Sequence, residues 1–196
     1  MRLPLWLKIG WSVWVLVWAP VYWRQYGAQN FLYFCDLGNI LIALGLWLES
    51  PLIFSWQATG LLLFQTLYTV DLAGALATGR HFIGGSEFMF DAGIPLYVRL
   101  LSLFHVVTPL LLLWLVRRLG YDQRGWVCAT LTAWVVLPIC YLWRPQFDVN
   151  WARGFWGHEQ HVVPGLVYLV VYMVLAPLVV YWPTHVLLRW WGRIRG

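Results

Sequence analysis

Four ionisable side chains lie within long apolar stretches of the sequence, where they are costly unless they have a partner or a function. They are Asp36, Asp71, Arg99 and His105. On insertion scales, a charged residue at the centre of a membrane helix costs about 2.5–3.5 kcal/mol. Carboxylates and an imidazole in such surroundings are suited to proton transfer. We therefore treat these residues as candidates for a functional site.

A thiol, Cys35, and an amide, Asn39, lie close to Asp36 if this stretch is a helix. Cys35 and Asn39 are four residues apart, and Asp36 precedes Asn39 by three, so the three side chains share one side of a helix. A thiol beside hydrogen-bonding groups is a candidate nucleophile, provided that a base or a positive environment produces the thiolate. A small apolar filler between helices is the alternative interpretation of Cys35.

A second helix carries Arg99, Ser102 and His105 in steps of three, and Gln65 adds a neutral amide on another stretch. His105 is the candidate general base within a span. A neutral imidazole that forms a hydrogen bond between helices is the alternative for this residue.

The charged pair has a structural interpretation beside the catalytic one. Arg99 forms an ion pair with Asp36 or Asp71 that holds helices together where lipid provides no hydrophobic drive. The two interpretations are compatible, because a paired carboxylate also orients a histidine, in this chain His105.

The stretch HEQH offers two imidazoles, His158 and His161, three residues apart. Such spacing can hold a metal on one helical turn, but the stretch lacks the HExxH pattern of zinc proteases and has no cysteine nearby. A polar interfacial loop is the interpretation we favour, and we expect no cofactor.

The composition predicts an integral membrane protein. Of the 196 residues, 61% are hydrophobic and 11% are charged, whereas soluble domains carry about 25% charged residues. The 16 Trp and 10 Tyr suit the membrane–water boundary. The net charge of +5 is spread over short connections, without the basic stripe of a nucleic-acid-binding protein.

Apolar runs of roughly 20 residues mark membrane helices, and the sequence contains six. We therefore predict an all-α, single-domain bundle over residues 1–196, with a tight hairpin at 49–51 and two long loops at 79–92 and 144–162. The predicted spans are 5–23, 29–48, 52–76, 93–116, 126–143 and 163–188.

The distribution of Lys and Arg predicts the orientation. Eight of these residues flank the side that carries both termini, and four flank the other side. The positive-inside rule then places both termini in the cytoplasm and both long loops outside. Asp36, Asp71 and Arg99 lie in the outer halves of their spans, which suggests a polar pocket that opens to the non-cytoplasmic side.

Four stretches resemble, in order, segments of the YwaF-type bacterial integral membrane proteins. FLYFCDLGNILIALGLWLE resembles their Cys-Asp-Leu helix, LLLFQTLYTVDL their Gln…Pro-Asp-Leu segment, RLLSLFHVVTPLLLLW their histidine-bearing helix, and DVNWARG their Val-Asn-Trp…Gly segment. That family is similar to a eukaryotic transmembrane lipid acyltransferase and, more distantly, to hydrolases of fatty-acid esters of hydroxy fatty acids. The chain also looks like bacterial proteins known only as membrane-associated proteins.

The resemblance implies acyl transfer or ester hydrolysis on a lipid, with Cys35 matching the nucleophile and His105 the base. Asn39 is suited to stabilising the oxyanion, and Asp36 or Asp71 to orienting the base. The family often has His two residues before the Cys, where this chain has Tyr33.

Two functional hypotheses follow for a protein of the bacterial inner membrane. The first is an intramembrane acyl-lipid transferase or esterase, with Arg99, Ser102 and Gln65 as substrate-binding or structural residues. The second is a non-catalytic subunit, or a lipid- or pigment-binding scaffold, of a larger membrane complex. Membrane lipids are partners in both.

Overall fold

The computed structural model describes residues 3–143, 145–155 and 158–193; Arg2, Arg144 and Arg195, which enter the charge count, lie outside these ranges. Within these ranges the chain forms helices joined by turns and irregular segments, and it contains no strand. Five helical stretches are long and apolar enough to cross a membrane, which confirms the predicted all-α polytopic bundle. They are α1 (Leu5–Tyr26), α3 (Pro51–Thr78), Leu96–Leu119, α6 (Gly125–Leu142) and Gly165–Gly192.

The predicted span at 29–48 is not one α-helix. It consists of a 3₁₀ turn, η1 (Ala28–Leu32), and a short α-helix, α2 (Phe34–Leu48), which meet at Tyr33. At 1.5 Å per residue, 15 residues of α2 cover only about 22 Å of the roughly 30 Å of hydrocarbon. The candidate site residues Cys35 and Asp36 therefore lie in the first turn of α2 rather than inside a longer helix.

Two other predicted spans are interrupted. The one at 93–116 is divided into α4 (Leu96–Leu101) and α5 (Phe104–Leu119) by a break at Ser102. The last one runs from α7 (Gly165–Leu175) through a π-helical turn, Ala176–Tyr181, into α8 (Trp182–Arg193). Pro177 lies in that turn; proline has no N–H for the α-helical ladder, so the wider π turn accommodates it.

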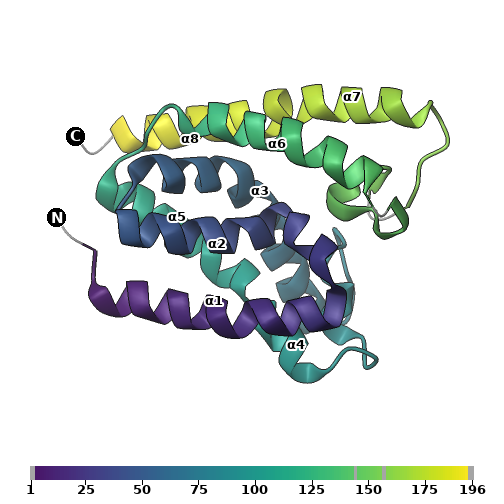
Figure 1. The fold of residues 1–196 in the computed structure, drawn as a ribbon, viewed down its shortest axis with the longest axis horizontal. Coiled ribbons are helices and arrows are strands. Elements are labelled where there is room, and N and C mark those ends of the chain that lie inside the picture. The colour runs from purple at the N-terminus through teal and green to yellow at the C-terminus, as the bar shows by residue number, and fades with distance from the viewer. Residues whose placement is uncertain (1–2, 144, 156–157, 194–196) are drawn as a thin grey trace.

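Helix α3 is the centre of the bundle and packs against α2, α5, α6 and α8. Figure 1 shows α1, α2, α3 and α5 on one side of the molecule and α6 to α8 as a layer on the other. Small residues allow the closest approach: a Cβ added at Gly125 of α6 would lie 2.6 Å from the backbone of Ser55 in α3. Such contacts are typical of membrane bundles.

Both termini lie at one end of the bundle, and both long connections lie at the opposite end, which we call the loop end (Figure 1). The hairpin predicted at 49–51 is present at the end that carries the termini. Glu49 adopts a left-handed conformation there and pairs with Lys8 at 2.5 Å.

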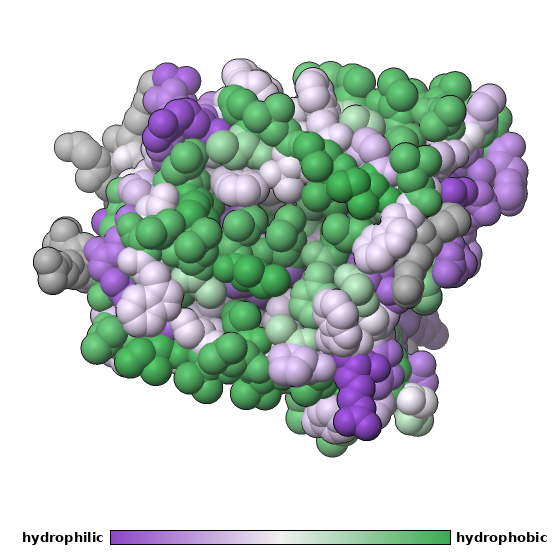
Figure 2. All heavy atoms as spheres, in the orientation of Figure 1, coloured by the Kyte–Doolittle hydropathy of each residue, from purple (hydrophilic) through white to green (hydrophobic). Residues whose placement is uncertain are grey.

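The surface has the character of a lipid-facing protein. Figure 2 shows apolar side chains over the middle of the molecule and hydrophilic ones toward its two ends. Exposed large side chains include Leu16, Leu76, Leu110 and Leu142. Such a surface belongs in a bilayer rather than in water.

Candidate active site at the loop end of the bundle

The first turn of α2 is held by a residue far away in the sequence. Asn150, in the turn η4 (Val149–Trp151), accepts a hydrogen bond from the Phe34 N–H at 3.0 Å and donates to the Leu32 carbonyl at 2.7 Å. Its left-handed backbone, with φ of 57°, directs the amide toward α2. The Phe34 N–H is one of the donors that a helix start leaves unpaired, so Asn150 caps α2.

This capped turn presents Cys35 and Asp36. Asp36 is 2% exposed and accepts a hydrogen bond from the side-chain amide of Asn30. The Cys35 sulfur lies 3.9 Å from an Asp36 carboxylate oxygen. Cys35 is half-buried against an apolar cluster of four residues, which we call the aromatic cluster: Trp18, Tyr22, Val98 and Phe104.

His105 borders the same cluster from α5. Its ring stacks on Phe104 at a centroid distance of 4.0 Å and on Tyr68 at 4.5 Å. Nδ1 lies 2.8 Å from the Ser102 carbonyl oxygen. A carbonyl only accepts, so this contact assigns the proton to Nδ1 and leaves Nε2 as a proton acceptor. The Ser102 hydroxyl in turn bonds to Tyr22 of α1, which fixes the break between α4 and α5.

The thiol and the imidazole are not hydrogen-bonded to each other. Among the described residues, the Cys35 thiol forms its hydrogen bond with Asp36, and the His105 ring forms its hydrogen bond with the Ser102 carbonyl. The predicted direct contact between Cys35 and His105 is therefore not formed in this structure. The two groups face the aromatic cluster from α2 and from α5.

Two buried amides, one on α2 and one on α3, have no hydrogen-bond partner among the described residues. Asn39 is 0% and Gln65 is 2% exposed, and neither the oxygen nor the nitrogen of either amide has a hydrogen-bond partner within the described residues. Buried amides in native proteins are almost always hydrogen-bonded. These two amides are therefore available to the polar atoms of a ligand.

Gln65 lies on α3, the helix that packs against both α2, which carries Cys35, and α5, which carries His105. Antiparallel helices α2 and α3 meet where a Cβ on Gly38 would touch the Leu61 side chain. One turn closer to the loop end, Gln65 faces the start of α2. The Thr69 hydroxyl, one further turn along α3, lies 3.4 Å from the His105 carbonyl oxygen. The Thr108 hydroxyl in α5 also lacks a partner.

The prediction that Arg99 pairs with Asp36 or Asp71 is wrong: the described residues show no such ion pair. Arg99 donates to the Met89 carbonyl at 2.9 Å, and neither Asp36 nor Asp71 forms a salt bridge with it. Asp36 instead accepts a hydrogen bond from the Asn30 side chain, and Asp71 accepts from N–H groups of the loop that follows α3. Hydrogen bonds of this kind stabilise a carboxylate as a nearby cation does.

Asp71 instead fixes the loop that follows α3. One carboxylate oxygen accepts the N–H groups of Phe82, Ile83 and Gly84 at 2.8–3.0 Å. The other carboxylate oxygen accepts a hydrogen bond from the Ser86 hydroxyl at 2.5 Å and lies 2.8 Å from His81 Nδ1. Asp71 is not hydrogen-bonded to His105, so its action on the site goes through the loop.

Sequence reasoning missed His81 and Ser86, and it assigned no role to Asn150 although that residue lies in the quoted segment DVNWARG. One signal was present for the loop: the glycine pair Gly84 and Gly85 follows Asp71 closely and has φ of 94° and 95°. Glycine there lets successive N–H groups turn toward one acceptor.

The histidines of HEQH do not form a metal site. Within the described ranges, no group of three or more His, Cys, Asp and Glu side chains is arranged to hold a metal. His161 instead lines a polar cavity, which is described below.

Comparison with known proteins gives no further constraint. No family model matches the chain, and no curated protein or solved structure matches it significantly.

Proposed function

We propose that this membrane protein is an acyl-lipid transferase or esterase, with Cys35 as nucleophile and His105 as base. One observation carries the proposal: Asn39 on α2, the helix that bears the thiol, and Gln65 on α3, which packs against both α2 and α5, have buried amides without a partner among the described residues. An ester or acyl carbonyl is a ligand of the right polarity for such amides, because its oxygen accepts the hydrogen bonds that Asn39 and Gln65 have free.

The reaction begins with proton transfer from the Cys35 thiol to Nε2 of His105, after which the sulfur attacks the acyl carbonyl carbon. An amide N–H of Asn39 or Gln65 stabilises the oxyanion. The intermediate then collapses, the ester C–O bond breaks, and His105 returns the proton to the departing alcohol. Water or a second hydroxyl, deprotonated by His105, attacks the thioester and releases the thiol.

Side-chain rotation about Cys35 brings the thiol to the imidazole when substrate is bound, since catalytic contacts are often loose in the unliganded state. Asp36 and Ser102 are positioning residues: Asp36 holds the thiol at 3.9 Å and the Ser102 carbonyl sets the His105 tautomer. Asp71 and Arg99 hold the loop 79–92 through hydrogen bonds to Phe82 and Met89.

The substrate enters from the lipid phase. Leu100, Leu103 and Val107 lie on the segment that carries His105 and are exposed, so acyl chains can pack beside the site. We place the protein in the bacterial inner membrane, with the site toward the non-cytoplasmic side, because the excess of Lys and Arg lies on the side that carries the termini.

A fatty-acyl chloromethyl ketone tests this proposal on the purified protein. We expect one label per chain, lost in Cys35→Ala and retained in the matched variants Cys128→Ala and Cys140→Ala. His105→Gln should slow labelling by about 10²–10⁴-fold. Equal labelling of wild type and Cys35→Ala would refute the enzyme, and a non-catalytic scaffold would then be the better account.

A further inference from the structure

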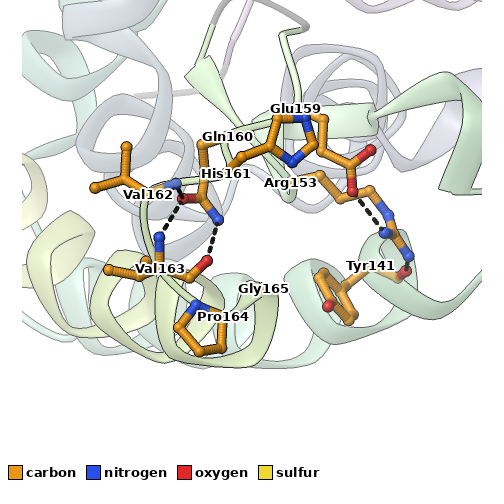
Figure 3. Close-up of a pocket in the computed structure, with 9 residues that line it drawn as sticks. All are labelled: Tyr141, Arg153, Glu159, Gln160, His161, Val162, Val163, Pro164 and Gly165. Atoms are coloured by element: carbon orange, nitrogen blue, oxygen red, sulfur yellow. Dashed lines mark hydrogen bonds and ion pairs between the residues drawn. The ribbon is translucent and has the colours of Figure 1, made fainter.

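A polar cavity of about 390 Å³ lies at the loop end, between the end of α6 and the start of α7. In Figure 3, Tyr141 and Arg153 lie on one side of the open space, Gln160, Val163 and Pro164 on the other, and His161 above it. None of the residues that line this cavity belongs to the aromatic cluster beside Cys35, so a ligand bound here need not take part in the chemistry of the thiol.

The guanidinium of Arg153 is the fixed cation of this cavity. It stacks on the Tyr141 ring at 4.4 Å and donates to the Tyr141 carbonyl at 2.8 Å. One more donor reaches Glu159 at 3.3 Å. A guanidinium has five N–H groups in a planar fork, so these bonds leave donors for an anion, and the stacking holds the fork in place.

Two further groups favour an anion. The His161 ring is exposed and has no hydrogen bond within the described residues. Gly165, the first residue of α7, also lines the cavity, and the first N–H groups of a helix are unpaired donors at the positive end of its dipole. An oxyanion such as a phosphate therefore has three kinds of donor available here: the guanidinium, the imidazole and the first N–H groups of α7.

The surroundings identify the source of the phosphate as a lipid. Helix α7 enters the bundle directly below the cavity, and Leu166, Val167 and Val170 are exposed along it. These side chains form an apolar track for acyl chains that starts at the cavity. Glu159, which is 57% exposed in its side chain, adds a carboxylate at the rim, where an ammonium group joined to the phosphate by a short carbon chain would lie.

We propose that this cavity binds the headgroup of a phospholipid that carries a primary ammonium, with the phosphate on Arg153 and His161 and the ammonium on Glu159. The site rests on the cavity and its charges, and it stands whether or not Cys35 is a nucleophile.

Native mass spectrometry of the full chain, delipidated in detergent, tests the proposal. The protein is offered an equimolar mixture of phosphatidylethanolamine, phosphatidylcholine and phosphatidylglycerol with identical acyl chains. We expect phosphatidylethanolamine adducts to dominate, and to fall at least tenfold in His161→Glu and Arg153→Gln. Arg80→Gln, which removes an exposed arginine from the other loop, should bind like wild type.

Three results would overturn the proposal. They are unchanged adducts in both cavity variants, equal retention of phosphatidylcholine, and displacement of the lipid by millimolar inorganic phosphate, which would indicate a site for free phosphate. If Arg153→Gln unfolds because Arg153 also anchors its loop, His161→Glu decides, since the His161 side chain is exposed and contributes no hydrogen bond to the fold.

Discussion

The side chain of Asn150 accepts a hydrogen bond from the backbone N–H of Phe34, 116 residues earlier in the chain. It also donates to the Leu32 carbonyl, so a single amide replaces the backbone partners that the break before α2 removes. The turn of Cys35 and Asp36 is thereby held by η4, which lies in the same connection between α6 and α7 as Arg153 and His161.

Removal of this cap should destabilise the protein. We expect Asn150→Gly to lower the free energy of unfolding by about 1–2 kcal/mol, the usual cost of a lost cap. Glycine keeps the left-handed backbone, so the change isolates the side chain. Asn150→Asp keeps the acceptor for Phe34 but turns a carboxylate oxygen toward the Leu32 carbonyl in a buried position, so it should cost at least as much as Asn150→Gly. Thermal unfolding in detergent measures both, and an Asn150→Gly variant as stable as wild type would contradict a capping role.

Replacing the amides of Asn39 and Gln65 by apolar side chains should preserve or raise stability and lower activity. Because both are buried and unpaired, Asn39→Leu and Gln65→Met should leave the melting temperature unchanged or higher, since an unpaired buried polar group costs about 1–3 kcal/mol. The same variants should slow labelling of Cys35 by at least tenfold. Thr59→Val is the matched control: its hydroxyl is buried but hydrogen-bonded to the Ser55 carbonyl, so its loss should destabilise. Lower stability in both amide variants would show that the amides are satisfied in the native protein.

The loop after α3 should depend on Asp71. Asp71→Ala leaves the N–H groups of residues 82–84 without their acceptor, and we expect a loss of at least about 2 kcal/mol, with faster tryptic cleavage after Arg80. Asp71→Asn keeps one acceptor oxygen and should lie between wild type and Asp71→Ala. If cleavage after Arg80 is equally slow in all three proteins, the loop is held by other contacts.

Asp148 gives a prediction for pH. Burial raises the pKa of Asp148, outweighing its hydrogen bond from the Arg153 N–H and the attraction of the Arg153 charge. A carboxyl whose folded pKa lies above the unfolded value of about 3.9 contributes stability below that value, and this contribution is lost as the pH rises through the folded pKa. Asp148→Asn should therefore be at least as stable as wild type at pH 7, and its advantage should disappear near pH 4. Asparagine also suits the left-handed φ of 39°. An Asp148→Asn variant less stable at pH 7 than at pH 4, relative to wild type, would contradict the sign.

The orientation in the membrane is testable with cysteines. In a background with Cys35, Cys128 and Cys140 changed to Ala, Glu87→Cys at the loop end should react with an impermeant maleimide in intact cells. Asp122→Cys, in the turn at the opposite end, should react only after the membrane is opened, because the positive-inside rule places that side in the cytoplasm. The reverse pattern would invert the topology.

The sequence alone determined the membrane character, the all-α class and the order of the helices, because a bilayer demands apolar runs of a fixed length and internal backbone hydrogen bonds. It also placed Asp36, Asp71 and Arg99 in the outer halves of their spans, because position along a span translates directly into depth. The hairpin at Ser50 and Pro51 was also predictable from the sequence, and in the structure Ser50 caps α3 and Pro51 begins it.

The partners of these residues were decided only by the tertiary structure. Charge complementarity predicted that Arg99 pairs with an aspartate, but the loop 79–92 folds back and satisfies Asp71 with its own N–H groups. Hydropathy gave 29–48 as one span, but Asn150 supports a helix that starts only at Phe34. Periodicity specifies which face of a helix is apolar and nothing about which distant loop donor reaches which acceptor. That choice depends on backbone turns and on contacts across more than a hundred residues, which form when the bundle packs.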